Sequence, residues 1–77
     1  MSIHVKFFAS LRERLGREAQ EVEARDGLTV GALWCKVSET DGLPANVLAA
    51  LNQEYATPEQ PVHDGDEVAF FPPVTGG

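Results

Sequence analysis

The amino-acid sequence predicts a single α+β domain, in which a mixed β-sheet carries one main helix on one face. Three observations support this prediction: an alternating apolar segment near the N-terminus, an amphipathic segment in the middle, and a continuous apolar run near the C-terminus. A chain of 77 residues allows one modest core, and the 43% hydrophobic content suits a globular fold. We therefore assign residues 1–77 to one domain, with residues 72–77 as an extended C-terminal tail.

The first third of the chain predicts two strands that flank a short helix. Apolar side chains alternate over residues 3–7, which is typical of a strand with one buried face. Ser10 and Glu13 match a capping box at the start of a short helix, and Gly16 is placed to end it. A weaker alternation over residues 18–24 predicts a strand that returns beside the first.

The middle segment predicts the main helix. Thr29 is a suitable N-cap, and apolar residues follow it at positions i, i+3, i+4 and i+7, which lie on one helical face. We expect this helix to end near residues 41–42. The residues of its apolar face are Val30, Leu33, Trp34 and Val37.

The remaining segments are predicted to be extended. Residues 47–51 are a strand candidate and residues 52–54 a turn, whereas two prolines restrict residues 55–62 to an edge strand or a loop. The sequence Asp-Gly-Asp at residues 64–66 predicts a turn. The continuous apolar run at residues 68–71 predicts a central strand that is covered on both faces.

The order of these elements indicates the topology. If the last strand pairs with the first in the centre of the sheet, the main helix covers one face of a mixed sheet. That arrangement is the β-grasp, or ubiquitin-like, fold.

The C-terminal tail is the most unusual part of the sequence. Two prolines cannot continue a sheet ladder, and they direct the chain stiffly away from the body. Four extended residues after them reach about 13–14 Å, which is enough to enter the active site of another protein. Two final glycines carry no side chain, so the backbone fits a narrow channel; the alternative is an ordinary frayed terminus. The tail consists of Pro72, Pro73, Val74, Thr75, Gly76 and Gly77.

The chemistry of such a tail resides in the α-carboxylate of Gly77. A carboxylate is a poor electrophile, so it must first be converted to a better one, and an ATP-dependent partner could do so by forming an acyl-adenylate. A sulfur donor can then displace AMP and leave a thiocarboxylate, whose sulfur is a soft nucleophile. This chemistry requires no active site within the chain itself.

The charge distribution restricts the classes of partner. The net charge is −6, and residues 37–77 contain seven acidic residues but no Lys or Arg. This field repels nucleic acids and anionic lipids, and it leaves open both a solvated acidic surface and steering toward a basic partner. The sequence contains no signal peptide or membrane span, so we expect a cytoplasmic protein.

Cysteine and histidine give no sign of a metal site or a bound cofactor. A single cysteine, Cys35, excludes an internal disulfide and a cysteine-based zinc site. We place it on the polar side of the main helix as a boundary residue, with a persulfide-carrying role as the alternative. His4 and His63 lack the spacing of metal ligands and are expected to be surface or turn residues.

Several motifs together resemble the small subunit family of molybdopterin synthase. They are Val5-Lys6-Phe7-Phe8-Ala9, Leu11-Arg12-Glu13, Leu51-Asn52-Gln53 and the ending Asp64-Gly65-Asp66-Glu67-Val68-Ala69-Phe70-Phe71-Pro72-Pro73-Val74-Thr75-Gly76-Gly77. The resemblance spans essentially the full chain, and the long ending is more diagnostic than a bare Gly-Gly.

The resemblance implies a sulfur carrier in molybdenum cofactor biosynthesis. An E1-like adenylyltransferase uses ATP to activate Gly77, and a sulfur-transfer enzyme converts it to a thiocarboxylate, 1-thioglycine. The tail then enters the large subunit, where its sulfur goes to cyclic pyranopterin monophosphate to make molybdopterin. The resemblance also implies an assembly of two small and two large subunits, with the acid–base residues in the large subunit.

Three residues are candidates for binding a partner. Strand alternation sends Phe8 and Phe71 to the sheet face opposite the helix, where exposed aromatic side chains favour an interface. The alternative is that they fill a local hollow. Arg12 lies near the same edge, either as an ordinary exposed helix residue or as the partner of an acid on the large subunit.

Other functions share part of this pattern. A sulfur carrier for thiazole or cysteine synthesis would use the same tail chemistry, and a ubiquitin-like modifier would join its final glycine to lysines. A plain interaction domain would not need Gly77 at all.

Overall fold

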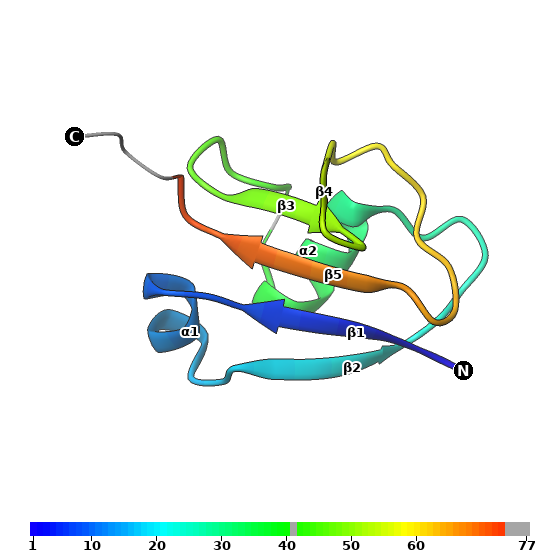
Figure 1. The fold of residues 1–77 in the computed structure, drawn as a ribbon, viewed down its shortest axis with the longest axis horizontal. Coiled ribbons are helices and arrows are strands. Elements are labelled where there is room, and N and C mark those ends of the chain that lie inside the picture. Colours follow the sequence, from blue (N-terminus) through cyan, green and yellow to red (C-terminus); the bar gives the residue numbers. More distant parts are fainter. Residues whose placement is uncertain (41, 74–77) are drawn as a thin grey trace.

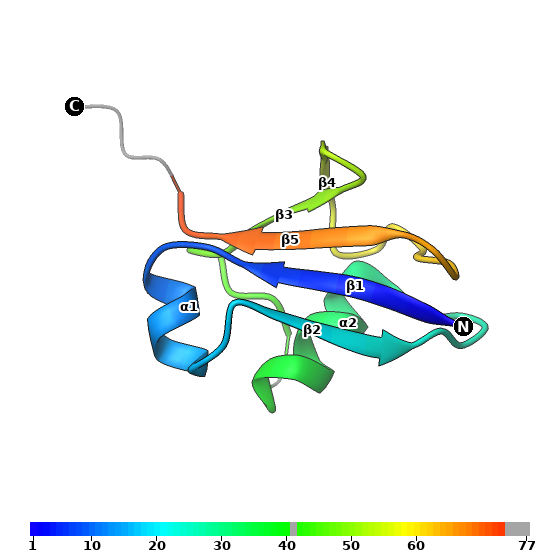
Figure 2. The ribbon, with the colours of Figure 1, turned by 60° about the horizontal axis from the view of Figure 1, so that its bottom comes forward.

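The computed structural model describes residues 1–40 and 42–73. In this part of the chain, a five-stranded mixed sheet carries one helix across one face and a second, shorter helix beyond one end (Figures 1 and 2). The elements are β1 (Ser2–Phe7), α1 (Ser10–Leu15), β2 (Ala19–Glu23), α2 (Val30–Ser38), β3 (Leu48–Leu51), β4 (Glu54–Ala56) and β5 (Glu67–Phe71).

The first and last strands form the centre of the sheet, whose strand order is β2-β1-β5-β3-β4. β1 is parallel to β5, with Val5 opposite Val68 and Phe7 opposite Phe70. β2 is antiparallel to β1, and β3 is antiparallel to both β5 and β4. The predicted β-grasp fold is therefore confirmed, including the return of the second strand beside the first.

The core lies between α2 and the inner face of the sheet. The ring of Trp34 meets the ring of Phe70 edge-on at 5.0 Å, and Phe7 stacks on Phe70 at 6.3 Å. Such ring pairs contribute about 0.5–1.5 kcal/mol beyond the burial of their area. The predicted inward residues are confirmed, because relative exposure is 3% or less for Ile3, Val5, Phe7, Val30, Leu33, Trp34, Val37, Val68 and Phe70.

Helix α1 forms where the sequence predicts it, but its start differs. Ser10 is the first helical residue and not its cap, because Ala9 occupies the N-cap position and makes no side-chain hydrogen bond. The predicted capping box of Ser10 and Glu13 is therefore wrong. Gly16 ends the helix as predicted, with the left-handed φ of 71° that glycine tolerates.

Helix α2 begins as predicted and ends early. Thr29 caps it, since its Oγ1 accepts a hydrogen bond from the backbone N–H of Ala32 at 3.1 Å. The helix ends at Ser38 and not near residues 41–42, because Glu39 turns into the left-handed region with a φ of 59°.

The segment between α2 and β5 forms the far edge of the sheet. β3 starts one residue after the predicted start at Val47, and the predicted turn joins it to β4 through Asn52 and Gln53, whose φ values are 50° and 73°. Two successive positive φ values are typical of the tight turn that matches strand twist. β4 is an edge strand, as the prolines after it require.

Strand β5 is central, but only one of its faces is fully covered. Val68 and Phe70 are 0% exposed beneath α2, whereas Ala69 and Phe71 on the other face are half-buried. The prediction that this strand is covered on both faces is therefore wrong. Both described helices leave the outer face of the sheet open, and that open face bears the candidate site.

Candidate functional site

The tail leaves the body at one end of the central strand. Phe71, opposite Leu48, is the last residue of β5 in the ladder. Pro72 follows half-buried and Pro73 exposed, and neither can donate a backbone hydrogen bond to continue the sheet. The structure describes the chain as far as Pro73, and the role of Pro72 and Pro73 as the start of a projecting tail stays a prediction. The predictions for Val74, Thr75, Gly76 and Gly77 fall outside the described residues.

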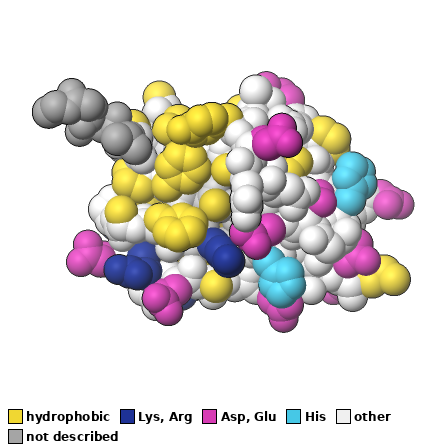
Figure 3. Space-filling view, viewed as in Figure 1, with side chains coloured by type: hydrophobic (Ala, Val, Ile, Leu, Met, Phe, Trp, Pro, Cys, Tyr) yellow, Lys and Arg dark blue, Asp and Glu magenta, His cyan; other side chains and the backbone are white. Residues whose placement is uncertain are grey.

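An apolar surface surrounds this exit on the outer face of the sheet. Its residues follow from strand alternation and register: Leu48 pairs with Phe71, Ala50 pairs with Ala69, and Ala50 also pairs with Tyr55 of β4. The space-filling view shows this apolar side chain cluster at the end of the molecule that bears the tail (Figure 3). We call it the apolar patch, composed of Phe8, Leu48, Ala50, Tyr55, Ala69 and Phe71.

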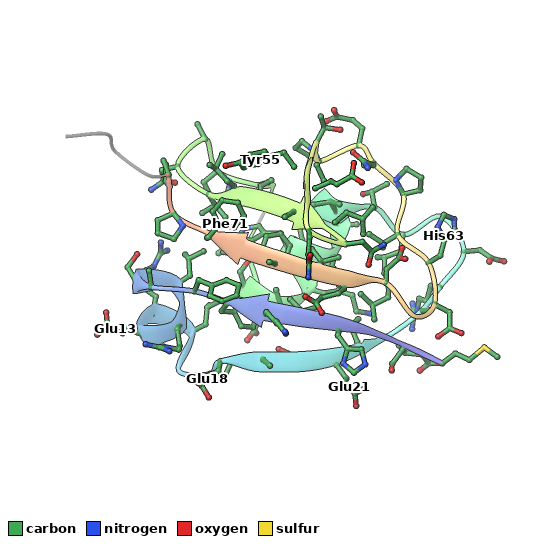
Figure 4. The ribbon with its side chains drawn as sticks, in the orientation of Figure 1. Glu13, Glu18, Glu21, Tyr55, His63 and Phe71 are labelled. Atoms are coloured by element: carbon green, nitrogen blue, oxygen red, sulfur yellow. The ribbon has the colours of Figure 1, made fainter. Side chains whose placement is uncertain are left out.

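The aromatic members of the patch are poorly covered by the chain itself. Phe8 is 48% exposed and Tyr55 is 78% exposed. The Tyr55 and Phe71 rings lie 6.0 Å apart and tilted, and Figure 4 shows them on the same side of the sheet. The predicted outward orientation of Phe8 and Phe71 is confirmed. Exposed aromatic clusters of this kind are typical of protein interfaces, so their predicted role in partner binding is consistent with the geometry.

Tyr55 is the aromatic member of the patch that the sequence does not predict. The sequence predicts only an edge strand or a loop for this segment, because its two prolines interrupt the pattern expected of a strand. The two-residue turn at Asn52 and Gln53 is the signal that finds it, because such a turn fixes the register of the hairpin. That register places Tyr55 opposite Ala50 and therefore on the face of Phe71.

The other half of the same face is polar and paired. His4 Nδ1 lies 3.4 Å from Glu21 Oε1, and Lys6 Nζ lies 3.6 Å from Glu67 Oε2. These pairs join β2, β1 and β5 side by side. The outer face is therefore divided, with an apolar half at the tail exit and a charged half toward the opposite end.

Arg12 lies on α1, near the end of the sheet from which the tail leaves. Its Nη1 lies 3.4 Å from Glu18 Oε1, with the two side chains 53% and 80% exposed. Exposed pairs of this kind are worth about 0–1 kcal/mol, so an acid on a partner can replace Glu18 at little cost. The pairing of Arg12 with a partner stays a prediction.

A polar network holds the opposite end of β5. The Asn52 side-chain amide donates to Asp66 Oδ1 at 3.0 Å, and its Oδ1 accepts from the Glu67 N–H at 2.9 Å. The backbone N–H of His63 donates to Asp66 Oδ2 at 2.8 Å. Hydrogen bonds from Asn52 and His63 to its charged form lower the pKa of Asp66. The network connects the β3–β4 turn to the start of β5, and it assigns Asn52 and Asp66 of the sequence motifs a structural role.

The remaining chemical groups do not converge. Cys35 is half-buried on α2, and its Sγ accepts a hydrogen bond from the Gly42 N–H at 3.1 Å. The imidazole Nδ1 of His63 lies 3.9 Å from Asp66 Oδ2, and His63 lies at the end of the sheet away from the tail exit (Figure 4). Across residues 1–40 and 42–73, no three His, Cys, Asp or Glu side chains are grouped to hold a metal ion. No helix in the same ranges is both long enough and apolar enough to span a membrane.

The chain is similar to known proteins over nearly all of its length. Residues 5–77 match the ThiS family. The chain is 48% identical to the molybdopterin synthase sulfur carrier subunit of Escherichia coli (strain K12), over 97% of this chain and 99% of that protein. It is similar to SAMP1 from Haloferax volcanii, with a TM-score of 0.82 and 29% identity over 100% of both chains. It is also similar to a chain in the complex of subunits 1 and 2 of molybdopterin-converting factor from Helicobacter pylori 26695, with a TM-score of 0.66 and 27% identity over 100% of both chains.

Proposed function

The chain belongs to the ThiS family, and we propose that it is the sulfur carrier subunit of a molybdopterin synthase in molybdenum cofactor biosynthesis. The observation that carries this proposal is the 48% identity to such a subunit over nearly the whole of both chains. The fold supports it, because the central strand delivers the Pro-Pro exit directly beside an exposed apolar patch.

The first step of the proposed cycle activates Gly77. Its carboxylate oxygen attacks the α-phosphate of ATP on an E1-like adenylyltransferase, which forms the acyl-adenylate and releases pyrophosphate. Sulfide supplied by a sulfur-transfer enzyme then attacks the acyl carbon, a C–S bond forms as the bond from carbon to the phosphate oxygen breaks, and AMP leaves. The product is 1-thioglycine, a terminal thiocarboxylate. Since this step consumes ATP, the proposal places the carrier in the cytoplasm.

The second step gives the sulfur to the pterin. The tail enters the large subunit of molybdopterin synthase, and the thiocarboxylate sulfur forms a bond to a carbon of cyclic pyranopterin monophosphate. Water then cleaves the bond between this sulfur and the acyl carbon of Gly77, which leaves the sulfur on the pterin and returns the Gly77 carboxylate. Molybdopterin has two sulfurs, so two carriers are consumed per product, which suits an assembly of two small and two large subunits. The similarity to a chain in the complex of subunits 1 and 2 of molybdopterin-converting factor supports this partner.

The apolar patch supplies the docking surface in this proposal. It lies beside the tail exit, so a partner that receives the tail also covers Phe8, Phe71 and Tyr55. Buried aromatic anchors contribute strongly to binding, and the charged half of the face forms a polar rim. Arg12 is placed at the edge of the same surface to meet an acidic residue of the large subunit. The chain contributes the sulfur and the docking surface, while the large subunit provides the catalytic acid–base groups.

Reconstitution tests the proposal directly. The chain is mixed with the E1-like enzyme, ATP, Mg²⁺ and a sulfide source, and its intact mass is measured. One oxygen should be replaced by sulfur at the C-terminus, and the product should then convert cyclic pyranopterin monophosphate in the presence of the large subunit. The matched control lacks Gly77 and keeps the rest of the fold. If that shortened chain supports the same conversion, the proposal is wrong.

A second candidate function is conjugation to other proteins. The similarity to SAMP1 of Haloferax volcanii, a small archaeal modifier protein, favours it. A lysine amine would then attack the acyl-adenylate in place of sulfur, giving an amide bond and AMP. Conjugates that survive denaturing gels and depend on Gly77 would establish this function. If cells that make molybdopterin contain no such conjugates, sulfur transfer is the function of this chain and conjugation is not.

A further inference from the structure

Ala9, between β1 and α1, has a backbone conformation that L-residues rarely adopt. Its φ is 54° and its ψ is −131°. The Leu11 N–H donates to the Phe8 carbonyl at 3.2 Å, so residues 8–11 form a β-turn with Ala9 in its second position. Those angles are close to the mirror image of the type II turn at about (−60°, +120°), where glycine, asparagine and aspartate dominate. An alanine there is strained, because its Cβ crowds the backbone.

This strain differs from that at the other positive-φ residues. Glu39, with a φ of 59° and a ψ of 33°, is in the left-handed helical well, which non-glycine residues tolerate. Ala9 is outside that well and is exposed to solvent, so core packing on its own side chain does not impose the conformation. The conformation is imposed by its neighbours. Phe8 is tied to β5 by its N–H to the Phe70 carbonyl at 3.1 Å, and Leu11 is buried.

The strained turn lies within the proposed docking surface. It joins Phe8, the exposed aromatic residue of the apolar patch, to the helix that carries Arg12, whose N–H donates to the Ala9 carbonyl at 3.1 Å. Both candidate contacts on this side of the tail are therefore within three residues of Ala9. A glycine would fit the turn without strain, yet the chain has alanine.

We propose that Ala9 is a positioning residue whose backbone strain is released when the large subunit docks. On binding, the peptide between Phe8 and Ala9 turns over, the Phe8 carbonyl gives up its hydrogen bond from the Leu11 N–H, and Ala9 moves to the extended region with a negative φ and a positive ψ. The released strain strengthens the complex. Backbone strain held at a functional site by the surrounding structure is a known way to link two conformations. The inference rests on the proposed docking of the large subunit on the apolar patch.

The test is a thermodynamic cycle with three residues at position 9. Glycine fits positive φ without strain, and D-alanine prefers it. Both replacements stabilise the free chain. If Ala9 has a negative φ in the bound state, affinity falls from the native chain with alanine, to the glycine variant, to the D-alanine chain, which binds most weakly. If the bound state keeps the turn, they stabilise both states equally and leave the affinity unchanged. The Ala9→Gly variant is made by expression, and the D-alanine chain by chemical synthesis of all 77 residues.

We expect Ala9→Gly to raise the thermal midpoint of the isolated chain by about 4 °C or more. Its affinity for the large subunit should fall about 5- to 50-fold, measured by titration calorimetry. The chain with D-alanine at position 9 should be at least as stable and bind more weakly still. Should Ala9→Gly fold poorly, the D-alanine chain alone decides, because its preferred φ maintains the native turn.

Gln53→Gly is the matched control. Gln53 also has a positive φ, of 73°, but it lies in the β3–β4 turn, away from the tail exit. Its replacement should leave the affinity unchanged. The inference is wrong if the glycine and D-alanine chains both bind the large subunit as tightly as the native chain. It is also wrong if glycine weakens binding and D-alanine restores it. If the unaltered chain does not bind the large subunit, the proposed function itself fails, which is a separate result.

Discussion

The chain has two pairs of consecutive phenylalanines, and in each pair one ring lies in the core and the other on the surface. Phe7 and Phe70 point inward, are 2% and 0% exposed, and stack in the core. Phe8 and Phe71, the next residue in each case, point to the outer face at the tail exit. Strand alternation alone separates the two roles. The first phenylalanine of each pair therefore stabilises the fold, and the second forms part of the proposed docking surface.

Phe70 is the inner phenylalanine whose loss should cost the most stability. Phe70→Ala removes a fully buried ring that contacts both Trp34 and Phe7. Such truncations cost about 3–5 kcal/mol, a large share of the roughly 5–15 kcal/mol that stabilises a domain. Urea unfolding of the isolated chain measures the loss. A loss of less than about 1 kcal/mol, well under the usual range, would mean that Phe70 is not a core anchor.

Phe71→Ala tests the outer half. We expect it to weaken binding to the large subunit by about 2 kcal/mol or more, roughly 30-fold, as for a central aromatic anchor. Its cost to stability should be smaller, because the ring is half-buried and contacts the exposed Tyr55. Titration calorimetry and urea unfolding give the two numbers.

His4→Ala is the control for this variant. His4 lies on the same sheet face but in its charged half, where it pairs with Glu21. Its removal should change the affinity far less than Phe71→Ala does, because contacts at the polar rim of an interface contribute little binding energy. A Phe71→Ala chain that binds normally but is badly destabilised would reverse the assignment of Phe71.

The sequence predicts the fold well because its strongest signals are periodic. Alternation in β1 and the apolar face of α2 reflect burial, and their buried residues are those predicted. In the apolar run of β5 only Val68 and Phe70 are buried, so that run indicates a central strand but not two covered faces. The other errors lie at element ends. The capping box fails because the backbone turn at Ala9 precedes Ser10, and α2 ends early because Glu39 turns left-handed. Backbone conformations of this kind have no period, so the pattern of side chains does not reveal them.

The sequence predicts only part of the candidate site, because only some of its residues follow from a periodic pattern or from proline chemistry. Phe8 and Phe71 follow from alternation along single strands, and the exit at Pro72 follows from the chemistry of proline. Tyr55 joins the patch only through the pairing of β3 with β4, which depends on a two-residue turn. The conformation of Ala9 also depends on its neighbours, because the ladder bond of Phe8 and the burial of Leu11 impose it.

Asp66, at the end of β5 away from the apolar patch, should affect stability only slightly and only in acid. Asp66 accepts hydrogen bonds from Asn52 and His63, which lower its pKa in the folded chain. A carboxyl whose pKa is lower in the folded state stabilises the fold at pH values above the unfolded pKa of about 3.9. This contribution is lost as the pH falls through the lower folded value. The unfolding free energy should therefore decrease in acid, and Asp66→Asn should reduce that decrease.

Urea unfolding of both chains from pH 7 down to pH values below about 3 measures the difference. The affinity for the large subunit at neutral pH should not change in Asp66→Asn, because the network lies away from the apolar patch. Equal acid sensitivity in the two chains would show that the bonds to Asp66 do not contribute to stability. A loss of affinity would instead show that docking extends to the polar end of β5, so that fold stability and partner recognition are not separated along this strand.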